Sequence, residues 1–342
     1  MSNGSLYCTF CGLPFDAHQI SAAIVPHDCI DSYAPWAYDD HVINEKQVAW
    51  IDDFRLMTTK EDLIPKDNFT TLDYNVEISV PAFWGEYERV RIEGEITEYA
   101  VYGSPSQPGF IFRVPAHDAC LKIAHEVMKW RLQNFEHPSD QDSPGGLLHL
   151  YNSIAERKKD RPYEPNMWFN NGYYGAMQYW GQPWSCELGG EWMVADPIKI
   201  PSLTNEMILK LGPFEYDSEQ ERSVFSRNQD LSQLEKLPSP AIDKILENLD
   251  WTSIESLRCC SISACNAFKP TGKFWKDRVL DNRVVPWLWD LDKDLVEKIE
   301  VKVNWEGLVR SLNKKHLFEN EELPIGLRNR IRISKVVLDI VI

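Results

Sequence analysis

The fold of the C-terminal part is decided by the stretch LPSPAIDKILENLDWTSIESLR, residues 237–258. Ser239 is a predicted N-cap, and Pro240 follows at the first helical position, where the missing N–H of proline costs nothing. Thr252 and Glu255 have the spacing of a capping box. Apolar side chains recur at the spacing of one helical face, at Ile242, Ile245, Leu246 and Leu249. The stretch therefore predicts two short amphipathic helices in succession.

Two further signals extend this helical segment. The apolar side of the second helix continues through Ile254, Leu257, Cys260, Ala264 and Phe268. Lys269-Pro270 ends that helix, because the residue before a proline disfavours the helical conformation, and Gly272 begins a third. Three short helices in about 45 residues cannot bury all their apolar surface by themselves. We therefore expect part of this surface to meet a partner or the neighbouring domain.

The composition is that of a globular chain with a sizeable core. The 342 residues are 43% hydrophobic and 12% aromatic, which is enough for two domains. The net charge of -16 argues against nonspecific binding to nucleic acid or anionic lipid, since both require a surplus of Lys and Arg. Neither a membrane-spanning apolar run nor a secretory signal is found. We therefore expect a cytoplasmic or nuclear protein with reduced or metal-bound cysteines.

Cys8 and Cys11 form a C-x2-C pair followed by Gly12, which is typical of a zinc knuckle because glycine permits the tight turn. The other two ligands could come from a local H-x-C pair or a distant H-x2-C pair, namely His27 and Cys29 or His117 and Cys120. We favour the distant pair, because its spacing fits structural zinc sites better. The roughly 10 kcal/mol or more returned by zinc outweighs about 4 kcal/mol of loop closure. The alternative is a group of ordinary buried thiols with a core or helix-capping histidine. Without an H-E-x-x-H pattern, catalytic zinc is not expected.

The middle of the chain predicts a small sheet and several helices. Alternating apolar and polar residues indicate strands with one buried face, over 76–80 and 90–96. A third strand is expected over 110–114. It should end at Pro115, where the chain enters a long amphipathic helix that covers 119–132. Later elements are expected as a helix over 146–158, a strand over 195–201 and a helix over 203–211.

An aromatic tract covers residues 163–192, where Trp and Tyr are interleaved with glycine and follow no period. Cladding of the small sheet explains it better than a ligand surface does. Acidic residues beside Trp can have raised pKa values, so an enzyme with a site in 163–196 would use Glu187, Glu191 or Asp196. The acidic pair Asp39-Asp40 could bind a cation, although a solvated turn is the simpler explanation.

These elements predict an α+β fold class with an all-α C-terminal part. A zinc-stapled domain of small sheet, helices and Trp-rich irregular region covers 1–211, and a polar, aperiodic linker covers 212–233. The helical segment covers 234–280. A helical extension over 281–342 is expected to pack on the same helices.

The helical segment carries a recognisable order of residues. After Leu237-Pro238 and the apolar face come Leu249-Asp250, Ile254, Leu257-Arg258, Ser261, Phe268 and Phe274-Trp275. This order resembles an F-box, the three-helix motif that docks onto the Skp adaptor subunit of Skp–cullin–F-box ubiquitin ligases. The resemblance covers residues 235–280. It implies a partner interface, or residues that hold its geometry, at Leu237, Pro238, Ile242, Ile245, Leu249, Leu257 and Trp275.

The rest of the chain is similar to a class of fungal F-box proteins. The shared features are C-x2-C-G, H-D-x-C, Pro-Trp-Leu-Trp-Asp and Leu-Arg-Asn-Arg, which here occupy 8–12, 117–120, 286–290 and 327–330. Cys259-Cys260 departs from the F-box pattern, which usually has ordinary apolar residues there, and Pro240 adds a second proline at the first helix. Neither departure should abolish docking.

The resemblance implies a non-catalytic substrate-recognition subunit of a ubiquitin ligase. The F-box would hold the Skp-type adaptor and, through it, the cullin, while the N-terminal domain presents a target. The chain has no G-x-S-x-G motif and no phosphate-binding loop. The alternatives are an enzyme with its site in the aromatic tract, an F-box scaffold acting outside the ligase, and a helical hairpin that packs only within its own chain.

Overall fold

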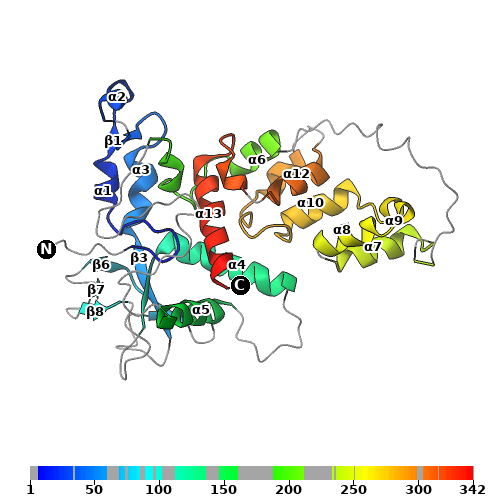
Figure 1. Ribbon diagram of the computed structural model, residues 1–342, viewed down its shortest axis with the longest axis horizontal. Helices are drawn as coiled ribbons and strands as arrows, with labels where there is room; N and C mark the ends of the chain where they lie inside the picture. Colours follow the sequence, from blue (N-terminus) through cyan, green and yellow to red (C-terminus); the bar gives the residue numbers. More distant parts are fainter. Residues whose placement is uncertain are drawn as a thin grey trace. The chain divides into compact units, whose positions relative to one another are not determined.

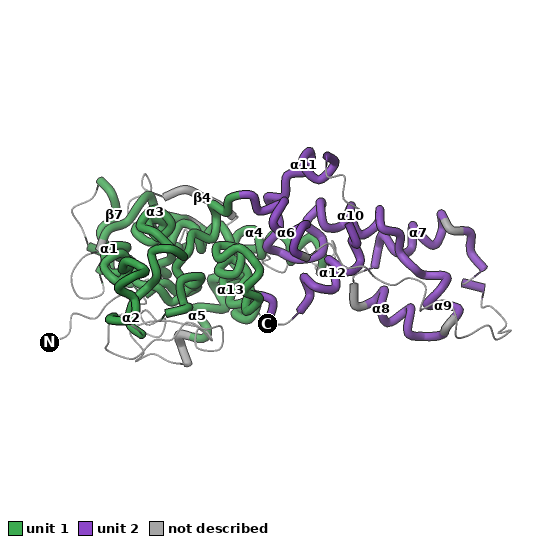
Figure 2. Tube along the Cα trace, turned by 90° about the horizontal axis from the view of Figure 1, so that it is seen from above, with its two compact units in different colours: residues 1–201, 318–342 green, residues 202–317 purple. Residues whose placement is uncertain are grey.

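The chain forms two compact units in a computed structural model (Figures 1 and 2). Unit 1 comprises residues 1–201 and 318–342, and unit 2 comprises residues 202–317. The structure describes residues 7–33, 35–59, 69–73, 76–84, 89–94, 98–101, 112–135, 146–160, 188–211, 233–234, 236–249, 251–298, 303–314 and 316–341. Most of the predicted linker and most of the aromatic tract lie outside these residues.

Unit 1 contains a seven-stranded antiparallel sheet built around β3 (Phe54–Thr59). β3 pairs with β5 (Val76–Ser79), β6 (Ala82–Trp84) and β9 (Val114–His117). The remaining strands are β4 (Phe69–Asp73), β7 (Arg89–Ile92) and β8 (Glu98–Ala100). The alternation of exposed and buried residues along β7 confirms the first part of the strand predicted over 90–96, which ends at Ile92 because a turn follows at 93–94. Strand β5 coincides with the strand predicted from Val76.

The predicted strand over 110–114 and helix start at Pro115 are wrong in their bounds. Strand β9 runs on to His117, because it pairs with β3 from Met57↔Val114 to Phe54↔His117. The helix begins only at Asp118. His117 is therefore the last residue of a strand, and its neighbour across the sheet is fixed by the ladder.

Three helices pack against one another in unit 1: α4 (Asp118–Phe135), α5 (Leu147–Asp160) and α13 (Ile325–Ile340) (Figure 1). The first two confirm the helices predicted near 119–132 and 146–158. Most of α13 is buried, including two polar side chains that donate hydrogen bonds to the backbone of 195–198. Asn329 donates to Ala195 O at 2.8 Å, and Arg330 donates to Pro197 O at 2.7 Å and Ile198 O at 3.1 Å.

The strand predicted over 195–201 is absent, because its backbone bends. The carboxylate of Asp196 accepts hydrogen bonds from the amides of Ile198 and Lys199, at 2.8 and 3.0 Å, which turns the chain on itself. The carbonyl oxygens of Ala195 and Pro197 in this bend accept hydrogen bonds from the buried side chains of α13. A short 3-10 helix, η5 (Glu191–Met193), precedes this bend.

The N-terminal part of unit 1 consists of short elements. Ile24–Val25 (β1) and Tyr38–Asp39 (β2) form a two-stranded parallel sheet. The others are α1 (Ala17–Ser21), η1 (His27–Cys29), α2 (Ile30–Tyr33), α3 (Glu45–Val48) and η2 (Ala49–Asp52). A hydrogen bond joins two of these elements: the Asp52 carboxylate at the end of η2 accepts the Ala17 N–H of α1 at 2.7 Å.

Unit 2 consists of helices joined by turns and irregular segments, with no strand among its described residues. Its elements are α6 (Leu203–Leu211), α7 (Ser239–Glu247), α8 (Trp251–Cys259), α9 (Ile262–Ala267), α10 (Gly272–Leu280), α11 (Lys293–Lys298) and α12 (Trp305–Leu312). A 3-10 helix, η7 (Leu317–Glu319), begins at the last residue of unit 2 and continues into the C-terminal segment of unit 1. The core holds Ile242, Leu246, Ile254, Ala264, Phe268, Trp275, Val279 and Val309.

The predicted helix caps in this region need correction. Pro238 is the N-cap of α7, so Ser239 and not Pro240 is its first helical residue. The second helix begins at Trp251, which places Thr252 inside it and rules out the predicted cap. It also ends at Cys259 instead of continuing to Phe268. The Ser261 hydroxyl accepts the Ala264 N–H at 2.9 Å and starts a separate helix, α9.

The tail does not pack as expected along its whole length. Residues 281–317 belong to unit 2, but 318–342 belong to unit 1, where α13 packs against α4, α5 and η5. Buried polar side chains explain this, because Asn329, Arg330 and Arg332 find their partners among the carbonyls of unit 1. None of the helices in the described parts of the chain has the length and apolar character needed to cross a membrane.

Candidate functional site

A tight turn at the start of unit 1 presents Cys8 and Cys11. The Gly12 amide donates to Cys8 O at 2.9 Å, and the Cys8 amide donates to Leu13 O at 2.9 Å. Gly12 has φ 76°, a conformation in which a side chain would be strained. The turn therefore brings both sulfurs to one side, as the C-x2-C-G pattern predicted.

The second pair comes from the junction of β9 and α4. His117 ends the strand opposite Phe54, and Cys120 lies in the first turn of the helix. The amide of Thr9 in the turn donates to Pro115 O on β9 at 3.5 Å, which joins the two segments. Phe15 and Trp50 pack on the His117 ring, with centroids 4.7 and 4.9 Å away, and shield it.

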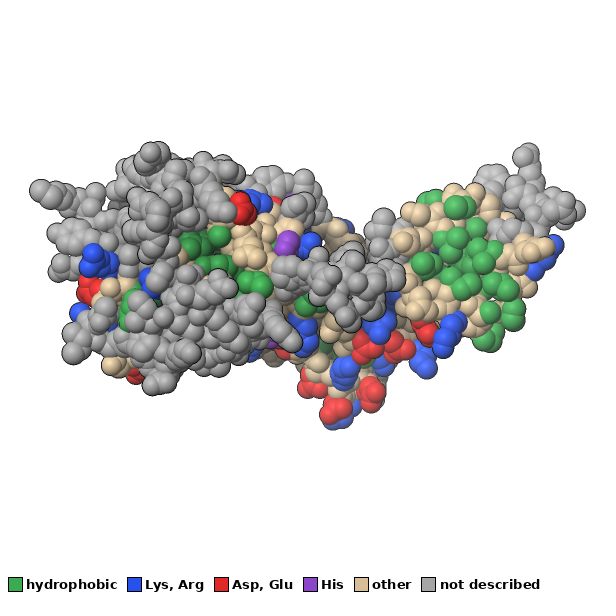
Figure 3. Space-filling model, turned by 90° about the horizontal axis from the view of Figure 1, so that it is seen from below, with side chains coloured by type: hydrophobic (Ala, Val, Ile, Leu, Met, Phe, Trp, Pro, Cys, Tyr) green, Lys and Arg blue, Asp and Glu red, His purple; other side chains and the backbone are tan. Residues whose placement is uncertain are grey.

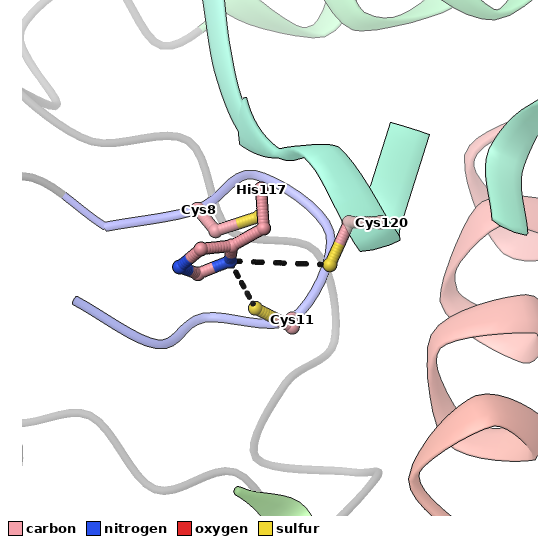
Figure 4. Close-up of side chains that lie close together, drawn as sticks. All are labelled: Cys8, Cys11, His117 and Cys120. Carbon is pink, nitrogen blue, oxygen red and sulfur yellow. Dashed lines mark hydrogen bonds between the residues drawn. The ribbon is translucent and has the colours of Figure 1, made fainter. Parts of the chain in front are cut away.

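The two pairs converge on one point (Figure 4). His117 Nδ1 lies 3.2 Å from Cys11 Sγ and 4.0 Å from Cys120 Sγ. Including Cys8, the four ligand atoms lie within 4.8 Å of one another and all four residues are buried. Ligands of one tetrahedral zinc ion are about 3.5–3.8 Å apart, so the cluster needs only small adjustments to close on a metal. The predicted grouping of Cys8, Cys11, His117 and Cys120 is confirmed, and these residues are called the Cys/His cluster below.

The surroundings orient the imidazole of the cluster. His117 Nε2 donates to Pro14 O at 3.1 Å, so Nδ1 is the nitrogen directed at the sulfurs. Metal-bound histidines usually make such a bond with their other nitrogen, because it fixes the ring and its tautomer. Arg332 of α13 is fully buried beside the turn and donates to Cys11 O at 2.8 Å. Its charge can offset the excess negative charge of three thiolates around a divalent ion.

Charges and hydrogen bonds within the cluster shift the pKa values of its members away from what burial alone would give. Burial alone would lower the pKa of His117, but the charges of Cys11 and Cys8 outweigh burial and raise this pKa to about 10. Burial would raise the pKa of Cys8, yet hydrogen bonds from Cys11 and Cys120 hold it well below its usual value. Burial raises the pKa of Cys120. A metal cation bound here would displace protons from these groups, because metal ligands must be deprotonated.

The alternative pair, His27 and Cys29, does not join this cluster. Cys29 is exposed, and the His27 ring is directed at the Asp39 carboxylate, with Nδ1 2.6 Å from Oδ2. His27, Asp39 and His41 form a separate group, whose ligand atoms also lie within 4.8 Å of one another.

The residues predicted to contact an adaptor fall into two sets. Ile242 and Trp275 are 7% and 1% exposed and belong to the core of unit 2, so they hold the helices in place. The others are half-buried or exposed, and they are Leu237, Pro238, Ile245, Leu249 and Leu257. Hydrophobic side chains gather over α7 and α8 on the face of unit 2 seen in Figure 3. We call the second set the α7/α8 face.

The two described acidic residues of the enzyme alternative, Glu191 and Asp196, bind different partners and do not face one another in the hydrogen bonds they make. Glu191 is buried and accepts the Asp39 N–H at 3.1 Å, whereas Asp196 accepts the amides of its own turn. Glu187 and most of the aromatic tract lie outside the described residues. Trp192 packs on Phe318, and Arg328 lies over its ring, which is a packing role.

Sequence reasoning missed two contributors to these sites. Arg332 follows the Leu-Arg-Asn-Arg motif by two residues, and only the tertiary structure reveals that it reaches Cys11 O. His41 directly follows the noted acidic pair Asp39-Asp40, but its proximity to His27 depends on the pairing of β1 with β2. No protein-family model, curated protein or solved structure matches the chain significantly.

Proposed function

We propose that the chain is a substrate-recognition subunit of a Skp–cullin–F-box ubiquitin ligase. The observation that carries the proposal is the α7/α8 face, a set of apolar side chains left partly exposed by helices whose core is already complete. The core of unit 2 uses Ile242 and Leu246 from α7 and Ile254 from α8. Leu237, Ile245, Leu249 and Leu257 are left half-exposed around it.

An exposed group of this kind suits a helical partner. Binding free energy is concentrated in a few side chains that become fully buried at an interface, and apolar side chains at helical spacing are a recurring way to anchor a helix on a partner. The F-box resemblance supplies the partner, a Skp-type adaptor. In this proposal catalysis belongs to a partner enzyme, and unit 1 presents the target.

Binding of the full-length chain to a Skp-type adaptor tests the proposal. Ile245→Asp is the sharpest probe, because Ile245 is half-buried but lies outside the core cluster of unit 2. A buried charge at the interface should lower adaptor affinity at least about tenfold. Leu209→Asp is the matched control, since Leu209 is a 53% exposed leucine of α6 outside the α7/α8 face.

The outcomes discriminate among the alternatives. Capture of adaptor and cullin by the wild-type and Leu209→Asp chains, with loss for Ile245→Asp, supports the ligase subunit. Capture of the adaptor without cullin favours a scaffold outside the ligase. If the wild-type chain captures no adaptor, the proposal is wrong and the helices serve only their own unit.

We propose further that the Cys/His cluster holds a structural zinc ion. Three thiols and one imidazole are ligands that suit zinc, and the four protein ligands leave no coordination position open for chemistry. Zinc would thereby join the N-terminal turn to the β9–α4 junction.

Metal analysis of the purified protein tests this proposal. We expect one tightly held zinc per chain, lost in Cys8→Ser combined with Cys120→Ser. Cys29→Ser should keep the ion, because this thiol is exposed and is not one of the cluster ligands. Retention of the ion by the double variant would exclude the cluster as its binding site.

A further inference from the structure

Two histidines meet outside the Cys/His cluster because of strand pairing. β1 and β2 run parallel with Val25 opposite Asp39, so the positions two residues beyond each are also neighbours. These positions are His27 and His41. Their rings stack with centroids 4.4 Å apart and planes 12° from parallel. The register of a two-stranded sheet thus places two imidazoles together at its end.

The carboxylate of Asp39 lies beside this pair and is held in place. Its Oδ1 accepts the His41 N–H at 2.9 Å, and its Oδ2 lies 2.6 Å from His27 Nδ1. The Asp39 N–H donates to the buried carboxylate of Glu191 at 3.1 Å, which anchors this residue to η5. Asp39 is therefore a fixed acceptor, with a side chain only 12% exposed, next to two histidine rings that reach solvent.

We propose that His27, Asp39 and His41 form a second metal site, which binds a late first-row divalent cation such as Zn²⁺ and is open to solvent. Two imidazoles and one carboxylate suit these cations, whereas Ca²⁺ and Mg²⁺ prefer sites made entirely of oxygen. Three protein ligands leave at least one coordination position for water or for a group on a partner.

The neighbouring charges favour a cation at this place. Asp40 accepts the His27 N–H through its own carboxylate at 2.9 Å, and Asp28 adjoins His27 in the sequence. Three carboxylates thus lie at or next to His27, those of Asp28, Asp39 and Asp40, and their negative charge favours a divalent cation there.

Binding requires two small movements, and both involve exposed side chains. The 2.6 Å between His27 Nδ1 and Asp39 Oδ2 is shorter than the about 3.3 Å between two ligands of a tetrahedral ion, so this pair must open slightly. The near-parallel rings cannot direct lone pairs at one ion until one ring turns. The His27 side chain is 53% exposed, so little packing opposes its rotation.

Metal titration of the full-length chain tests the site. The Cys/His cluster is first loaded with Zn²⁺ and loosely held metal is removed, and Co²⁺ is then added in a calorimeter. We expect the calorimeter to show one further equivalent of Co²⁺. A visible absorption spectrum of the same sample should show d–d bands without the near-ultraviolet sulfur-to-metal bands that thiolate ligands produce. His27→Ala with His41→Ala should weaken this binding by more than about tenfold, the smallest loss typical of removing even an outer-shell partner.

His18→Ala is the matched control, because His18 is an exposed histidine of α1 outside the group. In the wild-type protein, substoichiometric Co²⁺ should broaden the imidazole NMR signals of His27 and His41 and leave that of His18 sharp. This second measurement does not depend on the folding of a variant. Uptake unchanged in the double variant, no further equivalent in the wild type, or equal broadening of His18 would each overturn the proposal.

Discussion

The Cys/His cluster of unit 1 and the helices α7–α10 of unit 2 hold their parts of the chain together in opposite ways. The cluster joins residues as far apart as Cys11 and His117, separated by 106 positions, through buried polar atoms. The core of unit 2 comes mostly from consecutive helices within 239–280 and is apolar. A cluster of metal ligands stabilises the fold fully only when every ligand is present. An apolar helical core tolerates partial exposure, and in unit 2 it leaves the side chains of the α7/α8 face partly exposed.

Metal withdrawal should have the largest effect and should divide the two units. Binding free energies of structural zinc sites are about 10–16 kcal/mol and act as folding free energy. A strong chelator should therefore abolish the hydrogen-exchange protection of β9 and α4, while α7 and α10 keep theirs. If β9 and α4 stay protected without metal, the cluster does not fasten unit 1.

Trp275→Ala should have the next largest effect, confined to unit 2. This side chain is 1% exposed at the centre of the helical core. Loss of a buried Trp costs about 3–5 kcal/mol, because a cavity is left behind. Native-state hydrogen exchange of α7–α10 measures it. Leu209→Ala, at an exposed position, should change the free energy of unfolding by less than about 0.5 kcal/mol. Equal costs for the two variants would contradict the apolar account of unit 2.

Arg332→Met should destabilise unit 1 by about 2–4 kcal/mol, since it leaves Cys11 O and Asn329 Oδ1 without a donor from this side chain in a buried place. It should also make zinc about 10–100-fold easier to remove, as loss of an outer-shell partner does. Chelator competition and urea unfolding measure the two effects.

The control for Arg332 is Arg310→Met, which removes exposed ion pairs to Glu255 and Glu306 and should cost no more than about 1 kcal/mol. A change in stability without any change in zinc retention would show that Arg332 supports α13 alone.

Ser261→Ala should give the smallest effect, about 1 kcal/mol, because it removes the cap that starts α9. Exchange of the Ala264 amide, which loses its acceptor, is the direct measurement. Ser256→Ala, at an exposed position inside α8, should be neutral or slightly stabilising. If exchange of Ala264 is unchanged, the break between α8 and α9 does not depend on the cap.

Local patterns predicted the helices well and their ends poorly. The face through Ile242 and Leu246 and the stop before Pro270 follow from spacing and backbone sterics alone. The start of α7 shifted by one residue, and Ser261 interrupted the second predicted helix, because hydrophobic periodicity does not reveal which hydroxyl will cap a helix. The strand expected over 195–201 failed because Asp196 binds its own turn.

The sequence by itself determined the ligand types and spacing of Cys8, Cys11, His117 and Cys120, because thiolates and imidazole at those intervals are suited to a metal. It also determined the apolar helices that follow residue 237. Only the tertiary structure decided that Arg332 of α13 lies beside that cluster, and that strand register brings His27 to His41. The physical reason is that a chain's local pattern records chemistry and periodicity, whereas pairing between distant segments depends on which buried polar groups find partners once the whole unit is folded.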